Sequence, residues 1–336
     1  MASGPRAGSS SPSGAASGTP SGSSSGWSGG RPDGASPASL VGICAMGSRY
    51  PPAPRHTHAH ESDQRVTRLA RMSRVISFLT DYGHDDDFVG VCHGVMARIA
   101  PDARILDVTH GIPRHDIRSG ALVLRRALPY FPAGVHVAVV DPEVGAERRA
   151  VALRTAEDDR VLVGPDNGLL VPAAQQFGGV AEAVEITRSK HRLEPTSATF
   201  HGRDVFAPVG AQLAAGAPLA EAGEPLDPDE LVKLPMPEYR AEDNGLVAHA
   251  VAFDRFGNVM LDVEHDQVGN HGLRLGHPVA VNGEDAHYAT TFADVPSGAL
   301  LLYEDAYRWL ALAVNRGSAA DLLGLALDDE VRITSA

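Results

Sequence analysis

The chain has 336 residues, of which 43% are hydrophobic and 21% are charged, and its formal net charge is -13. This length and composition predict a globular protein of about two domains. The acidic excess argues against nucleic acid or an anionic membrane as a partner, and it is compatible with a small cationic ligand. No apolar run reaches the roughly 18 residues that span a bilayer, so we expect no membrane-embedded segment.

Residues 1–72 differ in composition from the rest of the chain. Up to about residue 39 they are mostly Gly, Ser, Pro and Ala, which cannot bury enough apolar area to offset chain entropy. We therefore expect a disordered low-complexity tail over 1–72, without the apolar core of a secretory signal. Cys44 and Cys92 have neither metal-ligand nor disulfide-framework spacing, which favours a cytoplasmic protein.

From residue 75 onward, short apolar runs alternate with stretches of helical periodicity. The run at 135–140 is apolar apart from His136, as expected of a strand buried on both faces of a parallel sheet. The alternation predicts a doubly wound α/β domain over 73–225. Its predicted strands are 75–79, 104–108, 135–140, 151–154, 161–163 and 183–186, and its helices are 88–99, 121–131 and 205–215.

A Pro- and acid-rich stretch, roughly 223–243, reads as a linker, and the pattern changes beyond it. Short strands with turn signals between them predict a smaller antiparallel, β-barrel-like domain over 240–336. The predicted strands are 246–253, 259–263, 279–281 and 288–292, with a helix near 318–323.

An acidic cluster follows the first predicted strand, in Thr80-Asp81-Tyr82-Gly83-His84-Asp85-Asp86-Asp87. In open α/β sheets, ligands bind beyond the carboxyl ends of the strands. Carboxylates here can accept ribose hydroxyls, bind an amine or hold a divalent metal. The carboxylates at 85–87 are equally suited to capping the following helix and complementing its dipole.

Two further clusters lie at strand or helix ends. Asp141 ends the buried strand, and Arg148 follows seven residues later, across a turn rich in Pro and Gly. The two side chains are suited to a purely structural ion pair or to a reactive site. His201 stands beside Gly202 at a predicted helix start, where it can be a general base, an orienting donor or a structural residue.

Two loops are candidates for supporting roles. Val163-Gly164-Pro165-Asp166-Asn167-Gly168-Leu169 is a turn after a strand. Phe253-Asp254-Arg255-Phe256-Gly257-Asn258-Val259 joins two strands of the second domain. Phe256 can stack on a base, and the Asn258 amide can donate to and accept from an adenine edge. A plain hairpin loop is the alternative reading.

Taken in order, these segments resemble the S-adenosylmethionine hydroxide adenosyltransferases, or S-adenosyl-L-methionine hydrolases, which are relatives of the fluorinating and chlorinating enzymes. The resemblance covers about 74–336. The segments that carry it are Thr80-Asp81-Tyr82-Gly83, Asp107-Val108-Thr109-His110, Asp141-Pro142 with Val144-Gly145 and Arg148-Arg149, Pro165-Asp166-Asn167-Gly168-Leu169, Phe200-His201-Gly202-Arg203-Asp204 and Phe256-Gly257-Asn258-Val259.

The resemblance implies hydrolysis of S-adenosyl-L-methionine to adenosine and methionine without metal or cofactor. It also implies a homotrimer with the active site between subunits. The family's water-activating residues correspond to Asp141, Arg148 and His201. The implied substrate contacts are Asp81 with ribose, Asp86 and Asp254 with the methionine part, and Phe256 and Asn258 with adenine.

The chain departs from the family pattern in two places. Glu143 stands where the family usually has Gly, and Glu304-Asp305-Ala306-Tyr307 replaces a methionine-contacting Asn-Ser stretch. Halide-using relatives lack the Asp and His and carry Ser at the position of Gly202, so this chain's residues favour water.

Two other functions are compatible with parts of the sequence. One is a calcium-dependent nucleoside hydrolase, although Leu79 stands where that family's Asp-rich loop has a further Asp. The other is a nucleoside-binding protein without turnover, in which Asp141, Arg148 and His201 are structural.

Overall fold

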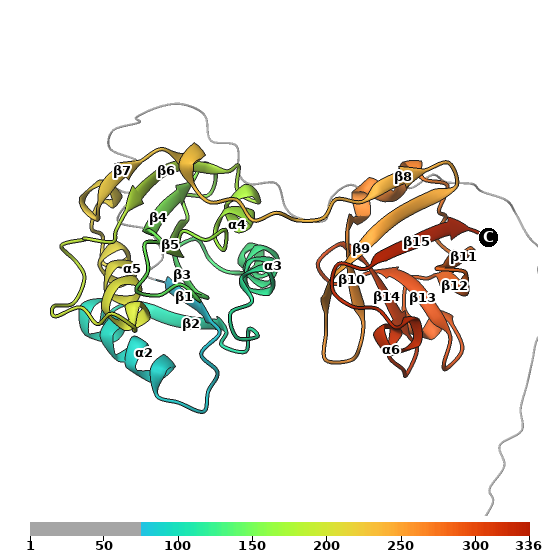
Figure 1. Ribbon diagram of the computed structural model, residues 1–336, viewed down its shortest axis with the longest axis horizontal. Coiled ribbons are helices and arrows are strands. Elements are labelled where there is room, and N and C mark those ends of the chain that lie inside the picture. The colour runs from blue at the N-terminus through green and yellow to red at the C-terminus, as the bar shows by residue number, and fades with distance from the viewer. Residues whose placement is uncertain (1–74) are drawn as a thin grey trace, which may run out of the picture. The chain divides into compact units, whose positions relative to one another are not determined.

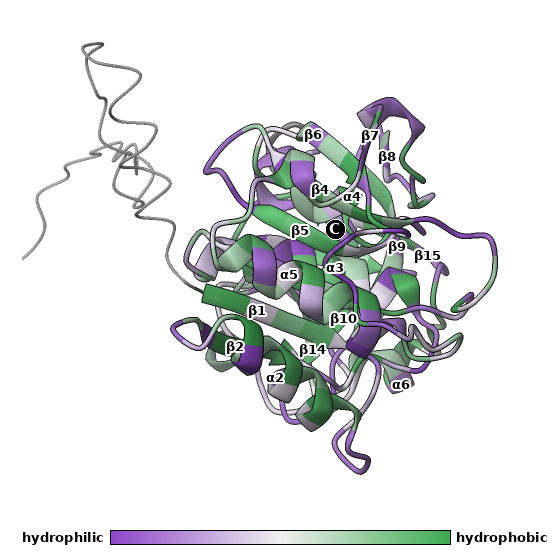
Figure 2. Cartoon of the chain, turned by 90° about the vertical axis from the view of Figure 1, so that its left-hand side faces the viewer, coloured by the Kyte–Doolittle hydropathy of each residue, from purple (hydrophilic) through white to green (hydrophobic). Residues whose placement is uncertain are grey.

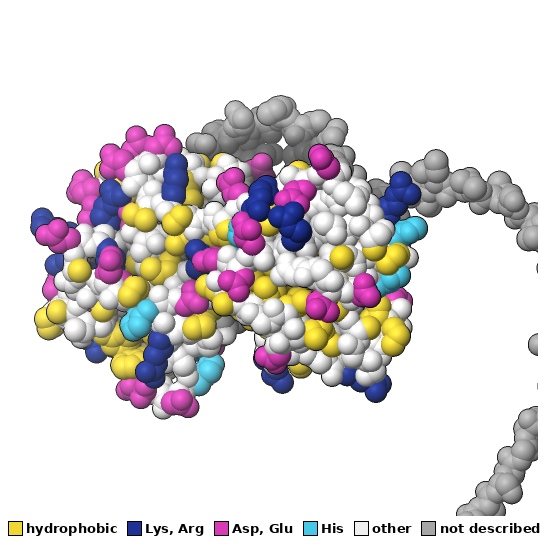
Figure 3. Space-filling model, turned by 45° about the vertical axis from the view of Figure 1, so that its right-hand side comes forward, with side chains coloured by type: hydrophobic (Ala, Val, Ile, Leu, Met, Phe, Trp, Pro, Cys, Tyr) yellow, Lys and Arg dark blue, Asp and Glu magenta, His cyan; other side chains and the backbone are white. Residues whose placement is uncertain are grey.

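A computed structural model describes residues 75–336, and the tail predicted over 1–72 lies outside them. The described residues form two β-sheets with accompanying helices (Figure 1). None of their helices has the length and apolar character needed to cross a membrane. On the face shown in Figure 3, acidic and basic side chains of this part of the chain are interspersed.

The first sheet has the order β2-β1-β3-β5-β4-β6-β7. Its first four strands are parallel, whereas β4 is antiparallel to both β5 and β6, and β7 is antiparallel to β6. Every residue of β1, β3 and β5 is buried, and Figure 2 shows β1 as mainly hydrophobic. The strands are β1 (Val75–Thr80), β2 (Arg104–Thr109), β3 (Val135–Val139), β4 (Ala150–Thr155), β5 (Val161–Pro165), β6 (Val180–Glu185) and β7 (Glu224–Leu226).

Helices cover both faces of this sheet, which confirms the doubly wound α/β prediction. On one face, α2 (Phe88–Ile99) and α5 (Ala207–Ala214) pack through residues such as Met96 and Val209 against Phe78. On the other face, α3 (Ile117–Ala127) and α4 (Val171–Gln175) pack against strand residues including Leu79 and Leu162. Figure 1 shows the two pairs on opposite sides of the strands.

The helix predicted over 205–215 is divided into two parts. A π-helical turn, Gly202–Phe206, precedes α5. Pro208 lacks the N–H that would bond to the carbonyl of Asp204 four residues earlier. That carbonyl instead accepts from the backbone N–H of Leu193 at 2.7 Å. Because Pro208 has no N–H, the Asp204 carbonyl can accept from Leu193, and this hydrogen bond joins the segment after His201 to the preceding loop.

The second sheet closes into a barrel, as the sequence predicted. Its order is β10-β14-β13-β12-β11-β15-β9-β8, and β10 also pairs with β9. Most neighbours are antiparallel, but β12 and β13 are parallel. The strands are β8 (Arg240–Glu242), β9 (Gly245–Phe253), β10 (Val259–Glu264), β11 (Pro278–Val281), β12 (Glu284–Tyr288), β13 (Leu300–Glu304), β14 (Trp309–Val314) and β15 (Glu330–Ser335), and the helix is α6 (Ala319–Leu323).

The strand predicted over 288–292 is wrong in position, because β12 ends at Tyr288. Asn282 and Gly283 both have positive φ, 51° and 86°, and they form the turn between β11 and β12. An Asn-Gly pair is the usual signal of a two-residue hairpin. This signal places a strand directly after Gly283, in agreement with β12.

Candidate active site

The predicted reactive residues come from two loops beside the first sheet, one between β3 and β4 and the other before the π-helical turn. Asp141 follows β3, Arg148 precedes β4, and His201 precedes the π-helical turn. Gly145, between the first two, has φ of 83°, and a Cβ there would lie 2.5 Å from the carbonyl oxygen of Ala198. Glycine therefore allows the 141–148 turn to approach the loop that carries His201.

Asp141, Arg148 and His201 form one hydrogen-bonded chain. Arg148 donates from Nε to Asp141 Oδ1 at 2.8 Å and from Nη2 to Asp141 Oδ2. The same Nη2 lies 3.0 Å from His201 Nδ1. The side chains of Arg148 and Asp141 are only 4% and 6% exposed. The structure thus brings together three residues that are up to 60 positions apart in the sequence.

The contact with Arg148 fixes which nitrogen of His201 carries the proton. A guanidinium can only donate, so His201 Nδ1 accepts and the neutral ring has its proton on Nε2. Burial lowers the pKa of His201, and the charge of Arg148 lowers it further, against the opposing effect of Asp141. At pH 7 the ring is therefore neutral, and its Nε2–H is a donor.

Aromatic side chains lie beside Arg148 and beside Gly202, the residue after His201. The guanidinium of Arg148 lies 5.2 Å from the centre of the Phe206 ring. Tyr82 packs edge-on against both Phe88 and Phe200, with ring centres 5.9 Å apart in each case. Burial raises the pKa of Tyr82 well above its usual value, so its hydroxyl stays protonated.

Tyr82 and Gly202 meet so closely that any side chain at position 202 would require Tyr82 to move. A Cβ on Gly202 would lie 2.1 Å from the Tyr82 hydroxyl oxygen. Sequence reasoning did not place Tyr82 in the site, because this contact joins segments far apart in the chain.

Replacing Gly202 with Ala is expected to displace Tyr82 and to lower both stability and turnover. Tyr82 is held between Phe88 and Phe200, so the overpacking should cost about 1–3 kcal/mol of unfolding free energy. Denaturant unfolding and steady-state kinetics measure the two effects. Gly94→Ala in α2 is the control, because its Cβ meets nothing within 4 Å and should stabilise the helix. Equal behaviour of the two variants contradicts the expectation.

The proposed ribose and methionine carboxylates lie in the β1–α2 loop. Asp81 Oδ2 accepts from the backbone N–H of His115 at 2.9 Å, which holds that side chain in place. Asp86 is exposed in the loop before α2. The turn at 165–169 supports the neighbouring strand end, since Asn167 Nδ2 donates to the carbonyl of Val140 at 2.9 Å.

The proposed adenine and methionine contacts of the barrel lie in the β9–β10 loop. Asp254 Oδ1 accepts from the backbone N–H groups of Phe256 and Asn258 at 2.8 and 3.0 Å. Asp254 Oδ2 accepts from Asn258 Nδ2 at 2.7 Å, and Phe256 is 65% exposed. Among the described residues, no hydrogen bond or ion pair joins this loop to Asp141, Arg148 or His201.

The residues that depart from the family pattern have local partners or are exposed. Glu304 pairs with His265 at 3.0 Å and with Arg308 at 3.4 Å. Asp305 accepts from the backbone N–H groups of Tyr307 and Trp309, which stabilises the β13–β14 turn. Glu143 is exposed in the turn between Asp141 and Arg148.

Residues 76–223 match the family described as SAM hydroxide adenosyltransferase N-terminal domain, and residues 248–332 match its C-terminal domain. The chain belongs to the SAM hydroxide adenosyltransferase family. This confirms the resemblance on which the sequence prediction rested.

Individual members of this family give the same result. The chain is 51% identical to an (R)-S-adenosyl-L-methionine hydrolase of Salinispora tropica, over 77% of this chain and 97% of the relative. It is 30% identical to a fluorinase of Nocardia brasiliensis, over 73% and 92% of the two chains. An uncharacterised conserved protein of Thermotoga maritima has a crystal structure that matches with a TM-score of 0.72 and 36% identity, over 77% and 99%.

Proposed function

We propose that this chain hydrolyses S-adenosyl-L-methionine to adenosine and L-methionine, with water attacking the ribose C5′. The observation that carries the proposal is the hydrogen-bonded chain Asp141–Arg148–His201 in a member of the SAM hydroxide adenosyltransferase family. The Salinispora relative is named for the (R) form of the substrate, and we extend the proposal to that epimer.

The nucleophile limits this reaction, because a sulfonium already has a good leaving group. Free water is a weak nucleophile with a pKa of about 15.7. The positive charge of Arg148 stabilises a water as it gains hydroxide character. His201 Nε2–H can donate to the same oxygen, and the Asp141 carboxylate is the remaining base for the water's proton.

The bonds balance without a further reactant. The water oxygen forms a bond to C5′, the C5′–S bond breaks, and its electron pair returns sulfur to a neutral thioether. One proton is released through Asp141 to solvent. Because opposite charges are neutralised in the transition state, a dry site favours the reaction. The proposed reaction therefore requires neither metal nor cofactor. We further propose that the protein is cytoplasmic.

Substrate binding is proposed to involve five residues outside the catalytic trio. We assign Asp81 to the ribose, Asp86 and Asp254 to the methionine part, and Phe256 and Asn258 to adenine. Phe256 is exposed on a loop that Asp254 holds by hydrogen bonds, so it is accessible to adenine bound at the site of a second copy of the chain. The proposed assembly is a homotrimer, with the active site between the α/β part of one subunit and the barrel of the next.

The decisive experiment is incubation with S-adenosyl-L-methionine in oxygen-18 water, followed by mass spectrometry of the products. We expect adenosine labelled at the 5′-oxygen, together with methionine, and unchanged turnover after thorough chelation. Unlabelled adenosine would show that a different bond is cleaved. Calcium-dependent release of free base from nucleosides would identify a nucleoside hydrolase, and binding without turnover would identify a nucleoside-binding protein.

A further inference from the structure

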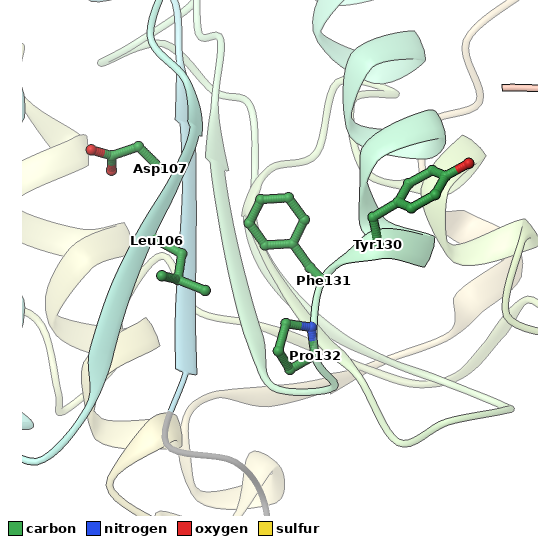
Figure 4. Close-up of a pocket in the computed structure, with 5 residues that line it drawn as sticks. All are labelled: Leu106, Asp107, Tyr130, Phe131 and Pro132. Atoms are coloured by element: carbon green, nitrogen blue, oxygen red, sulfur yellow. The ribbon is translucent and has the colours of Figure 1, made fainter. Parts of the chain in front are cut away.

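A second polar cluster lies at the end of β2, built from residues other than the catalytic trio. His93 of α2, Asp107 of β2 and His110 each offer a ligand atom, and these atoms all lie within 4.8 Å of one another. Asp107 Oδ1 lies 2.9 Å from His93 Nε2 and 3.1 Å from His110 Nε2. Figure 4 shows the Asp107 carboxylate pointing away from the other side chains that line a surface pocket of about 310 Å³, among them Leu106 and Phe131.

Of the three residues in the cluster, His110 has the surroundings that most favour a bound ligand. Its side chain is completely buried, and Nε2 has no hydrogen-bond partner, because the 3.1 Å contact with Asp107 lacks hydrogen-bond geometry. Leaving a buried polar atom without a partner is costly. Nδ1 of the same ring is 2.8 Å from Thr80 Oγ1, which fixes the orientation of the ring.

We propose that His93, Asp107 and His110 bind a divalent transition-metal ion, with zinc as the best fit. Two imidazoles and one carboxylate form an established ligand set for such ions, whereas calcium and magnesium prefer oxygen alone. Ligand atoms around a metal at 2.0–2.2 Å are roughly 3 Å apart, close to the two distances found here. With Nε2 facing the ion, His110 donates from Nδ1–H to Thr80 Oγ1, which has the form of the outer contacts that orient metal-ligating histidines.

The site is closed on one side and open on the other. His110 is buried, whereas the side chains of His93 and Asp107 are 32% and 39% exposed. Water can therefore complete the coordination and the ion can enter from solvent. The exposed His84 lies with its ring edge-on to that of His110, with centres 5.3 Å apart.

The ion would connect α2 to the end of β2, which in turn contacts the loop that carries Asp81. The carbonyl of His110 accepts from Gly83 N–H at 2.8 Å, and its ring contacts Thr80. The proposed role of the ion is to stabilise this loop, and the hydrolytic step does not use it.

The test is zinc binding to the untagged full-length chain. His56, His58 and His60 could also bind zinc, so every variant is made in a background with these three replaced by Ala. Calorimetric titration of Zn²⁺ should show about one ion per chain in that background. His93→Ala should weaken binding by about 10-fold or more, and His277→Ala, at an exposed histidine outside the cluster, should not.

Thermal unfolding provides a readout independent of the titration. At 100-fold excess over Kd, Zn²⁺ should raise Tm by roughly 5–10 °C in the background and in His277→Ala, but not in His93→Ala. Asp107→Asn, which preserves side-chain shape, should lose the shift as His93→Ala does. Absence of binding in the background, or equal affinity in His93→Ala, overturns the proposal and leaves a cluster held by hydrogen bonds alone.

Discussion

Arg148→Ala is expected to lower kcat by about 100- to 1000-fold while KM changes little. Removal of one donor that stabilises charge in the transition state typically has this effect. None of the proposed ribose, adenine or methionine contacts is removed. Steady-state kinetics, with substrate affinity by calorimetry, measures the two quantities separately.

The neighbouring arginine is a matched control. Arg149 donates to Asp166 at 2.8 Å and to Glu230, so its side-chain partners differ from those of Arg148. Arg149→Ala should therefore affect stability more than kcat. His201→Ala and Asp141→Ala should also lower kcat, and the losses should be far from additive because the three groups act on one water. Near-normal turnover in Arg148→Ala contradicts the proposed mechanism.

Asp141→Ala is expected to lower the free energy of unfolding by about 3–5 kcal/mol. It leaves the guanidinium of Arg148, whose side chain is only 4% exposed, without its carboxylate partner. Removing one member of a buried ion pair typically has this cost. Denaturant titration of each variant, with substrate absent, gives the free energies to compare.

A double variant separates the structural contribution of the pair from its chemistry. Asp141→Leu with Arg148→Met replaces both charges by apolar groups, which is often neutral for stability. We expect it to recover most of the lost stability and to show no turnover. Recovery of turnover would mean that the pair is structural, and wild-type stability in Asp141→Ala would mean that the ion pair contributes nothing to folding.

The fold could be predicted where local pattern and tertiary role agree. The uninterrupted apolar runs of β1 and β3 match strands buried on both faces, and Asp141 and His201 were candidates because one follows such a strand and the other precedes a helix. β13 and β14 were not predicted individually. A short apolar run such as Leu300–Glu304 has no period that separates a buried strand from a buried helix.

Features that depend on three-dimensional proximity could not be predicted. The sequence contains both Tyr82 and Gly202, but nothing local shows that the hydroxyl of one occupies the space of a Cβ on the other. The contact between Arg148 Nη2 and His201 Nδ1 could not be predicted either, and it places the proton of the neutral imidazole on Nε2. Residue identity indicates that a histidine can act as a base, whereas the contact with Arg148 makes it a donor.

The barrel contains one parallel pair, β12–β13, because its number of strands is odd, and no particular residue is needed to explain it. Seven strands close the barrel, and directions that alternate around a ring of odd number must fail to alternate at least once. A parallel pair cannot be joined by a tight hairpin. The chain between β12 and β13, residues 289–299, must therefore return along the length of the barrel before the next strand begins. The odd number of strands thus sets a minimum length for that connection, whereas the hairpin loop between β11 and β12 needs only Asn282 and Gly283.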